Sequence, residues 1–118
     1  MHGGGRMLEE DAIRRNRLFA ELTDANDAEE VAIRWREYLE GMLSFPFTAK
    51  STYSGSVTVT GLSRRDLCKH EMHVSVERNG GRLDVPLSSI KTVDASESTV
   101  KAVSDWHCWV KKGYRFGF

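Results

Sequence analysis

The sequence predicts an α+β domain, and three observations support that class. Apolar residues recur at helical spacing before about residue 43 and again after about residue 99. Between these segments apolar and polar residues alternate, which is typical of strands. Within the alternating segment, Asn79-Gly80 is a strong signal for a two-residue hairpin turn. Helices at both ends and paired strands between them account for the whole pattern.

The composition fits one globular domain without a charge bias. The chain has 118 residues, of which 40% are hydrophobic and 29% are charged. Its 17 basic side chains balance 17 acidic ones, which argues against broad binding to nucleic acids or anionic membranes. No apolar run has the length of a membrane span, and the N-terminus lacks the apolar region of a signal peptide. Two cysteines are too few for a disulfide framework, so we expect a cytoplasmic protein with free thiols.

The first helix is expected over Arg6–Leu22, a segment rich in Glu, Arg, Leu and Ala. Residues 1–5 read as a flexible leader, so the single domain should occupy residues 6–118. A basic cluster lies within this helix. Because several acidic residues surround the cluster, we expect it to form a solvated face. The cluster consists of Arg14, Arg15 and Arg17.

The second helix has the clearest helical pattern in the chain. Asp27 and Glu30 are spaced as a capping box at its start. It should end near Leu43, because Pro46 pushes the residue before it toward an extended conformation. Its apolar stripe comprises Val31, Trp35, Tyr38, Leu39 and Met42.

The strands follow, and one hairpin can be tested by its own register. Alternation is weak over residues 47–53, and a turn at residues 54–56 precedes a β-branched strand at 57–60. A hairpin over Glu71–Leu87, turning at Asn79-Gly80, gives apolar pairs on one face and polar pairs on the other. The apolar pairs are Met72 with Leu87, Val74 with Val85, and Val76 with Leu83; the polar pairs are Ser75 with Asp84 and Glu77 with Arg82. Pro86 indicates that the second hairpin strand lies at an edge of the sheet.

The last part of the chain predicts a short strand and a core helix. Ile90 and Val93 suggest the strand, and Asp94 or Ser96 can cap the helix that follows. Gly113 is a natural end for that helix. Its expected buried face is Val100, Val103, Trp106, Trp109 and Val110.

Residue patterns alone do not predict an enzyme. Four candidate zinc ligands are present, but none of the usual ligand spacings occurs. They are Cys68, His70, His107 and Cys108. A Cys/His nucleophile pair within this set has no implied acid partner. An EF-hand loop starting at Asp24 is absent, because its sixth position is Glu29 and not glycine.

An ordered series of motifs resembles the bacterial calcium-binding protein family typified by the cyanobacterial calcium-binding protein. The motifs extend from about Ala32 to Phe116. They are residues 35–39 (WREYL), 45–49 (FPFTA), 57–62 (VTVTGL), 66–68 (DLC), 71–74 (EMHV), 85–87 (VPL) and 105–109 (DWHCW), with Gly113-Tyr114 and Phe116. Each motif is weak alone, whereas the ordered set is fairly specific.

The resemblance implies a small α+β domain that binds calcium through surface carboxylates and has no enzymatic activity. The sheet should be curved and antiparallel, with about four to five strands, packed with two N-terminal helices and a C-terminal helix. Known members act as cytoplasmic calcium buffers or sensors. The matching acids, with one neighbour on the second helix, are Glu37, Glu40, Asp66, Glu71 and Asp105.

One segment departs from the family pattern. The loop expected to be acid-rich reads Arg64-Arg65-Asp66-Leu67-Cys68-Lys69-His70, in which basic residues surround a single aspartate. Each exposed cation opposes calcium by about 1 kcal/mol or less. Calcium binding is therefore expected to be weak or lost. The alternative is a non-enzymatic interaction module that binds a protein partner or itself through the aromatic C-terminus, Tyr114, Phe116 and Phe118.

Overall fold

A computed structural model describes residues 3–24, 27–52, 54–69 and 71–113, with side chains described from residue 11 onward. The helices are α1 (Gly3–Thr23), α2 (Ala28–Met42) and α3 (Glu97–Lys111), with short 3-10 helices η1 (Arg65–Cys68) and η2 (Leu87–Ser89). The strands are β1 (Phe47–Ser51), β2 (Gly55–Leu62), β3 (His73–Arg78), β4 (Gly81–Pro86) and β5 (Ile90–Asp94). They form one antiparallel sheet in the order β4-β3-β2-β1-β5. The predicted α+β class and strand number are confirmed.

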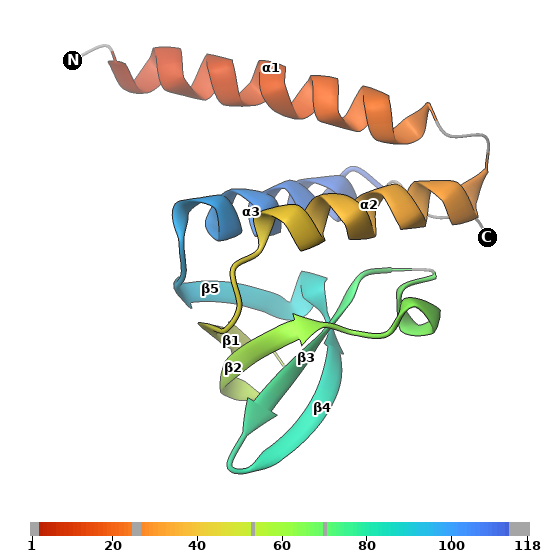
Figure 1. Ribbon diagram of the computed structural model, residues 1–118. Coiled ribbons are helices and arrows are strands. Elements are labelled where there is room, and N and C mark those ends of the chain that lie inside the picture. Colours follow the sequence, from red (N-terminus) through yellow and green to blue (C-terminus); the bar gives the residue numbers. More distant parts are fainter. Residues whose placement is uncertain (1–2, 25–26, 53, 70, 114–118) are drawn as a thin grey trace.

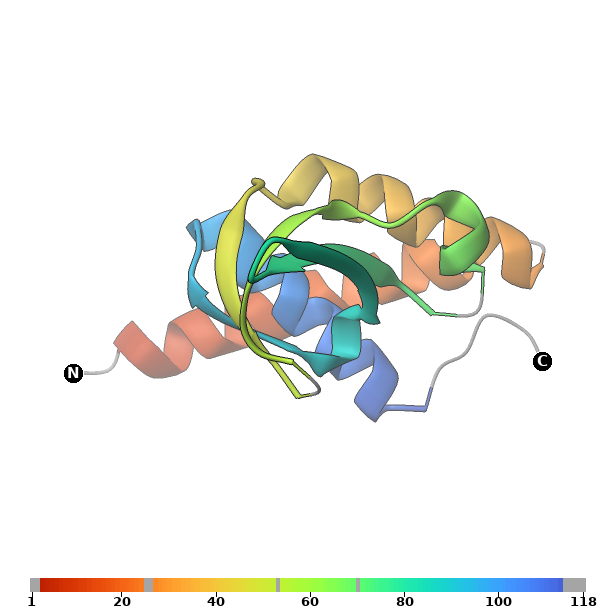
Figure 2. The same cartoon turned by 90° about the horizontal axis from the view of Figure 1, so that it is seen from below.

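The elements stack in three layers. Helices α2 and α3 lie side by side over the sheet, and α1 crosses above them as the outermost layer (Figure 1). Seen from below, the sheet curls beneath the helices, and η1 lies beside α2 (Figure 2). Within the described residues, no helix combines the length and the apolarity needed to cross a membrane.

Helix α1 begins earlier than the sequence predicts. It starts at Gly3, three residues before the predicted start at Arg6. A helix already formed from Arg6 onward gains further turns without a new nucleation cost, which allows the glycines to join it. Met1 and His2 lie outside the described residues. Phe19 and Leu22, near its C-terminal end, are buried and anchor α1 on the core.

The core is centred on Trp35 of α2, which is fully buried. Its ring meets Trp106 and Trp109 of α3 edge-on, with centroids 5.0 and 5.3 Å away. Phe19 of α1 contacts it at 6.0 Å and Tyr38 at 5.7 Å. Edge-to-face packing at these distances is favourable, because the ring edge is positive and the ring face negative. One side chain thus joins the three helices.

The predicted helix starts are confirmed, but the buried face of α3 is only partly as predicted. The Asp27 carboxylate accepts the Glu30 N–H at 2.8 Å and caps α2, while Ser96 caps α3. Val100 and Val110 are 43% and 40% exposed, in contrast to the prediction. The buried stripe runs one position earlier on the helix and includes polar residues, so apolar spacing alone misplaced it. That stripe is Thr99, Ala102, Val103, Asp105, Trp106 and Trp109.

The β3–β4 hairpin has the predicted register. Val76 pairs with Leu83 and Val74 with Val85, and the Leu87 N–H donates to the Met72 carbonyl at 2.8 Å. Strand β4 lies at the sheet edge, as Pro86 indicates. The apolar face is not buried throughout, however, because Leu83 is 41% exposed. The tip of the hairpin projects away from the helices (Figure 1).

The hairpin turn yields a stability prediction. Asn79 and Gly80 have φ angles of 52° and 80°, as this turn type requires. Gly80→Ala should cost about 1 kcal/mol of unfolding free energy, because a Cβ disfavours positive φ. Gly81→Ala is the matched control, since its φ is not positive and its Cβ would meet only Arg78 O at 3.6 Å. Urea unfolding followed by circular dichroism measures both; equal losses would contradict the backbone explanation.

Candidate calcium site

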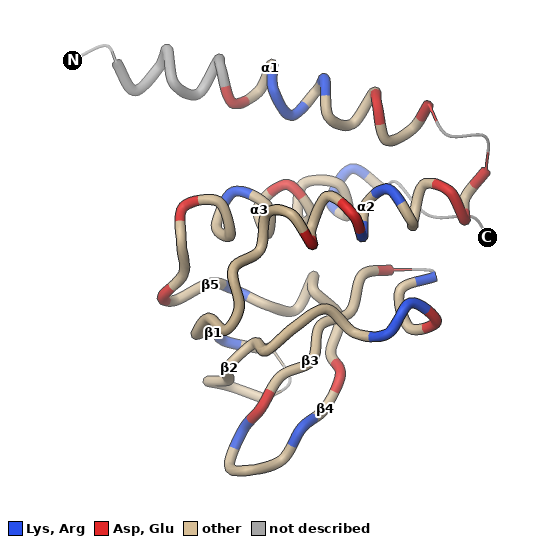
Figure 3. The backbone as a smooth tube through the Cα atoms, viewed as in Figure 1, with Lys and Arg blue, Asp and Glu red and all other residues tan. Residues whose placement is uncertain are grey.

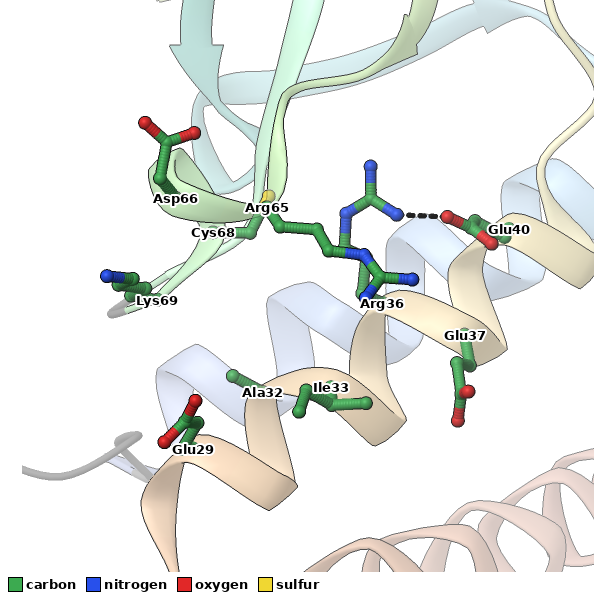
Figure 4. Close-up of a pocket in the computed structure, with 10 residues that line it drawn as sticks. All are labelled: Glu29, Ala32, Ile33, Arg36, Glu37, Glu40, Arg65, Asp66, Cys68 and Lys69. Atoms are coloured by element: carbon green, nitrogen blue, oxygen red, sulfur yellow. Dashed lines mark hydrogen bonds and ion pairs between the residues drawn. The ribbon is translucent and has the colours of Figure 1, made fainter.

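An open pocket of about 540 Å³ lies between α2 and the segment around η1. Helix α2 contributes Glu29, Ala32, Ile33, Arg36, Glu37 and Glu40; the η1 segment contributes Arg65, Asp66, Cys68 and Lys69. Figure 4 shows the floor of the pocket on α2, with η1 opposite. It therefore joins two segments that the sequence separates by about 30 positions.

Local structure explains how each side of the pocket is built. Glu29, Ile33, Arg36 and Glu40 follow one another at steps of three or four, so they share one side of α2. The η1 turn is closed by a 3.0 Å hydrogen bond from the Leu67 N–H to the Arg64 carbonyl. Buried Cys68 anchors that turn, because its sulfur accepts the His73 N–H at 3.5 Å.

Three of the predicted site residues, Glu37, Glu40 and Asp66, line this pocket. They do not converge in this conformation. Glu37 points away from η1, and Asp66 points away from α2 (Figure 4). Glu29 also lines the pocket, although the sequence analysis did not select it. Its spacing of eleven residues from Glu40, three helical turns, is the signal that could have found it.

Two of these acids already have cationic partners. Arg36 forms an ion pair with Glu40 and donates a second hydrogen bond to the Ser63 carbonyl at 2.9 Å. Arg64 lies 3.5 Å from Asp66, and both side chains of that pair are mostly exposed. Figure 3 shows acidic and basic residues interspersed along α2 and around η1. The pocket thus has four acids against Arg36, Arg65 and Lys69.

The other two predicted residues lie elsewhere. Glu71 is not among the residues that line the pocket, and its carboxylate is 3.9 Å from the His73 ring. Asp105 is fully buried beneath α1. It accepts hydrogen bonds from Arg14 at 3.0 Å and Arg15 at 2.8 Å. The structure therefore does not bring Asp105 to the pocket.

The Asp105 network also corrects, for Arg14 and Arg15, the prediction that the arginine cluster is a solvated face, whereas Arg17 is exposed as predicted. Arg14 and Arg15 turn inward because Asp105 is the buried anion that they neutralise. The hydrogen bond to Asp105 raises the pKa of Arg14 above its usual range. Tyr38 donates to the same carboxylate at 2.6 Å. Burial, followed by this hydrogen bond, raises the pKa of Tyr38 to about 12.

The zinc and Cys/His alternatives gain no support from the described part of the chain. Cys68 and Cys108 are free thiols. The His107 ring contacts the Leu87 carbonyl at 3.3 Å. His70 lies outside the described residues. Within the described ranges, no three His, Cys, Asp or Glu side chains are arranged to hold a metal ion.

Comparison with known proteins decides the family. A family model described as calcium binding, that of the CcbP proteins, matches residues 16–110. The chain belongs to the CcbP calcium-binding family. The crystal structure of Anabaena CcbP is 32% identical over 82% of this chain and 85% of that chain, with a TM-score of 0.73. A calcium binding protein solved in its calcium-binding form is 34% identical, covering 86% and 92% of the two chains, with a TM-score of 0.74. A search of curated proteins finds no match.

The pocket of this CcbP family member contains the type of ligand that calcium prefers. Calcium prefers hard oxygen ligands, which the four pocket carboxylates, Glu29, Glu37, Glu40 and Asp66, would supply. Their arrangement is not a preformed cage, because at least one acid is held by an arginine and two point away from the pocket centre. Binding at this pocket would therefore require the carboxylates to reorient.

Proposed function

We propose that this protein is a non-enzymatic cytoplasmic calcium buffer or sensor of bacterial type, and that the pocket between α2 and η1 is its metal site. Glu40 and Asp66 would be the principal ligands, with Glu29 and Glu37 completing the acidic set. The observation that carries the proposal is that a chain of the CcbP family gathers four carboxylates around one open pocket. Glu71 and Asp105 are left out of the site because they lie away from this pocket.

The chemistry of the pocket favours weak binding. Calcium takes six to eight oxygen ligands, so water and main-chain carbonyls would have to supplement the carboxylates. Arg36, Arg65 and Lys69 oppose a divalent cation, each by about 1 kcal/mol or less where exposed. We therefore expect a dissociation constant of about 10⁻⁴–10⁻³ M, at the weak end of protein calcium sites.

Calorimetric titration of metal-free protein tests the proposal. Calcium should bind with the stated affinity, and the Glu40→Gln/Asp66→Asn double variant should bind at least about tenfold more weakly, because two ligand charges are removed. Glu71→Gln is the control for location, since Glu71 is a half-exposed acid beside the His73 ring and outside the pocket. Absence of heat and of a thermal shift at millimolar calcium would reject calcium binding. Equal weakening by Glu71→Gln would reject the location.

The interaction-module alternative is not favoured by the comparisons, which point to calcium-binding proteins. Its motivating residues, Tyr114, Phe116 and Phe118, lie outside the described residues. No specific contact therefore argues for that function.

A further inference from the structure

We infer that Arg36 is a built-in competitor for calcium at this pocket: it holds Glu40 and thereby sets the threshold for metal binding. The inference rests on the proposed function and adds to it a residue that controls affinity. Arg36 is the only basic residue of α2 that lines the pocket within the described part of the chain. The competing cation is therefore the guanidinium of Arg36 itself. Arg36 lies one helical turn before Glu40, with which it forms an ion pair.

Arg36 is anchored more firmly than the acid it holds. One terminal nitrogen pairs with Glu40, and the other donates to the Ser63 carbonyl at 2.9 Å. The Arg36 side chain is only 18% exposed, whereas that of Glu40 is 51% exposed. Glu40 can therefore swing away while Arg36 stays tied to Ser63. The partner that must be released is thus the glutamate, which is also the candidate ligand.

The hydrogen bond to the Ser63 carbonyl fixes the position of the Arg36 guanidinium. Ser63 is 1% exposed and follows the end of β2. Its N–H donates to the His73 carbonyl at 3.0 Å, and its hydroxyl donates to Asp84 at 2.6 Å. An acceptor held in this way keeps Arg36 between α2 and the η1 segment, where Figure 4 shows it facing Glu40. A lysine ammonium at this position would lack the planar fork by which Arg36 binds Glu40 and Ser63 from two separate nitrogens.

Arg36→Gln should tighten calcium binding about fivefold, because it removes a cation in contact with a ligand. Arg34→Gln is a closely matched control. Arg34 lies on the same helix, pairs with Glu30 at 3.2 Å and donates to the Glu21 carbonyl at 2.8 Å, but it does not line the pocket. Both variants change the net charge equally. Calorimetry should therefore show tighter binding for Arg36→Gln and a change of less than about twofold for Arg34→Gln.

A double variant separates release of Glu40 from a general charge effect. If Arg36 acts by holding Glu40, Arg36→Gln/Glu40→Gln should bind calcium within about twofold of Glu40→Gln alone. A full fivefold gain in the Glu40→Gln background would overturn the inference. So would equal gains from Arg36→Gln and Arg34→Gln.

A spectroscopic readout does not depend on the affinity of any variant. The NMR signals of the Arg36 guanidinium in wild-type protein should move as calcium is added, because its Nη1 group loses the Glu40 carboxylate as a partner. An unchanged signal at saturating calcium would overturn the inference while leaving calcium binding intact. Absence of calcium binding by both wild type and Arg36→Gln would instead remove the proposed function together with the inference.

Discussion

Replacing Asp105 with alanine should lower the free energy of unfolding by about 3 kcal/mol, one of the largest losses available from a polar residue in this protein. Asp105 is fully buried and accepts hydrogen bonds from Arg14, Arg15 and Tyr38. Removal of the carboxylate leaves two positive charges facing each other beneath α1. The loss should not reach the upper end for buried pairs, because the arginine side chains are 37% and 27% exposed and can turn toward water.

Urea unfolding followed by circular dichroism measures this loss. Arg17→Ala is the control, because Arg17 is an exposed residue of α1, the helix that also carries Arg14 and Arg15. We expect its effect to stay within about 0.5 kcal/mol. Hydrogen exchange adds a local test: amides of α1 near Arg14 should lose protection in Asp105→Ala before those of α2. A loss below about 1 kcal/mol would mean that the network contributes little to holding α1.

Tyr38 gives the same network a dependence on alkaline pH. Its pKa is raised to about 12, first by burial and second by its hydrogen bond to Asp105. A group whose pKa is higher in the folded state stabilises that state fully below its unfolded value, about 10 for tyrosine. That contribution is lost as the pH rises from about 10 to 12. In Asp105→Ala the ultraviolet titration of this phenol should move to lower pH, although burial will keep part of the shift.

The Asp105 network shows which long-range contacts the sequence pattern hides. Arg14 and Arg15 are about 90 positions from Asp105. Acidic residues close to the two arginines in the sequence were enough to suggest a solvated, charge-balanced face. One signal was available. Asp105 comes three residues after Ala102 and four before Trp109, which places it on the buried stripe of α3. A buried carboxylate needs a cationic or hydrogen-bonding partner, so the position predicts a partner without naming it.

The hairpin could be predicted from neighbouring residues, whereas the pocket depends on contacts between distant segments of the chain. The hairpin register follows from neighbouring residues, because turn chemistry and alternation both fix the pairing of Val74 with Val85. The pocket depends on how α2 packs against η1, and no sequence period encodes that distance. Glu37 and Asp66, selected by family resemblance as candidate ligands, line the pocket, as does their helical neighbour Glu40. The resemblance did not indicate that Arg36 faces the same space.

Trp35→Ala should be the most damaging single change in the core, with an expected loss of about 3–5 kcal/mol. Trp35 is fully buried and contacts both α3 tryptophans as well as Phe19 of α1. Its removal opens a cavity where three helices meet, and no single neighbour can fill it without leaving another contact. A domain of this size has a total stability of roughly 5–15 kcal/mol, so the variant should be partly unfolded or close to its limit at 37 °C.

Two variants separate the role of Trp35 as a packing centre from its effect as a large apolar residue. Trp35→Phe keeps an aromatic ring and removes an indole N–H that has no hydrogen-bond partner among the described residues, so its loss should be about 1–2 kcal/mol. Ile33→Ala, on the same helix at a site 43% exposed, should cost less than about 1 kcal/mol. Circular dichroism is the appropriate probe, because the protein contains three tryptophans and fluorescence would change with the substitution itself. Equal losses for Trp35→Ala and Trp35→Phe would contradict the packing explanation, because the retained ring should preserve part of the contacts.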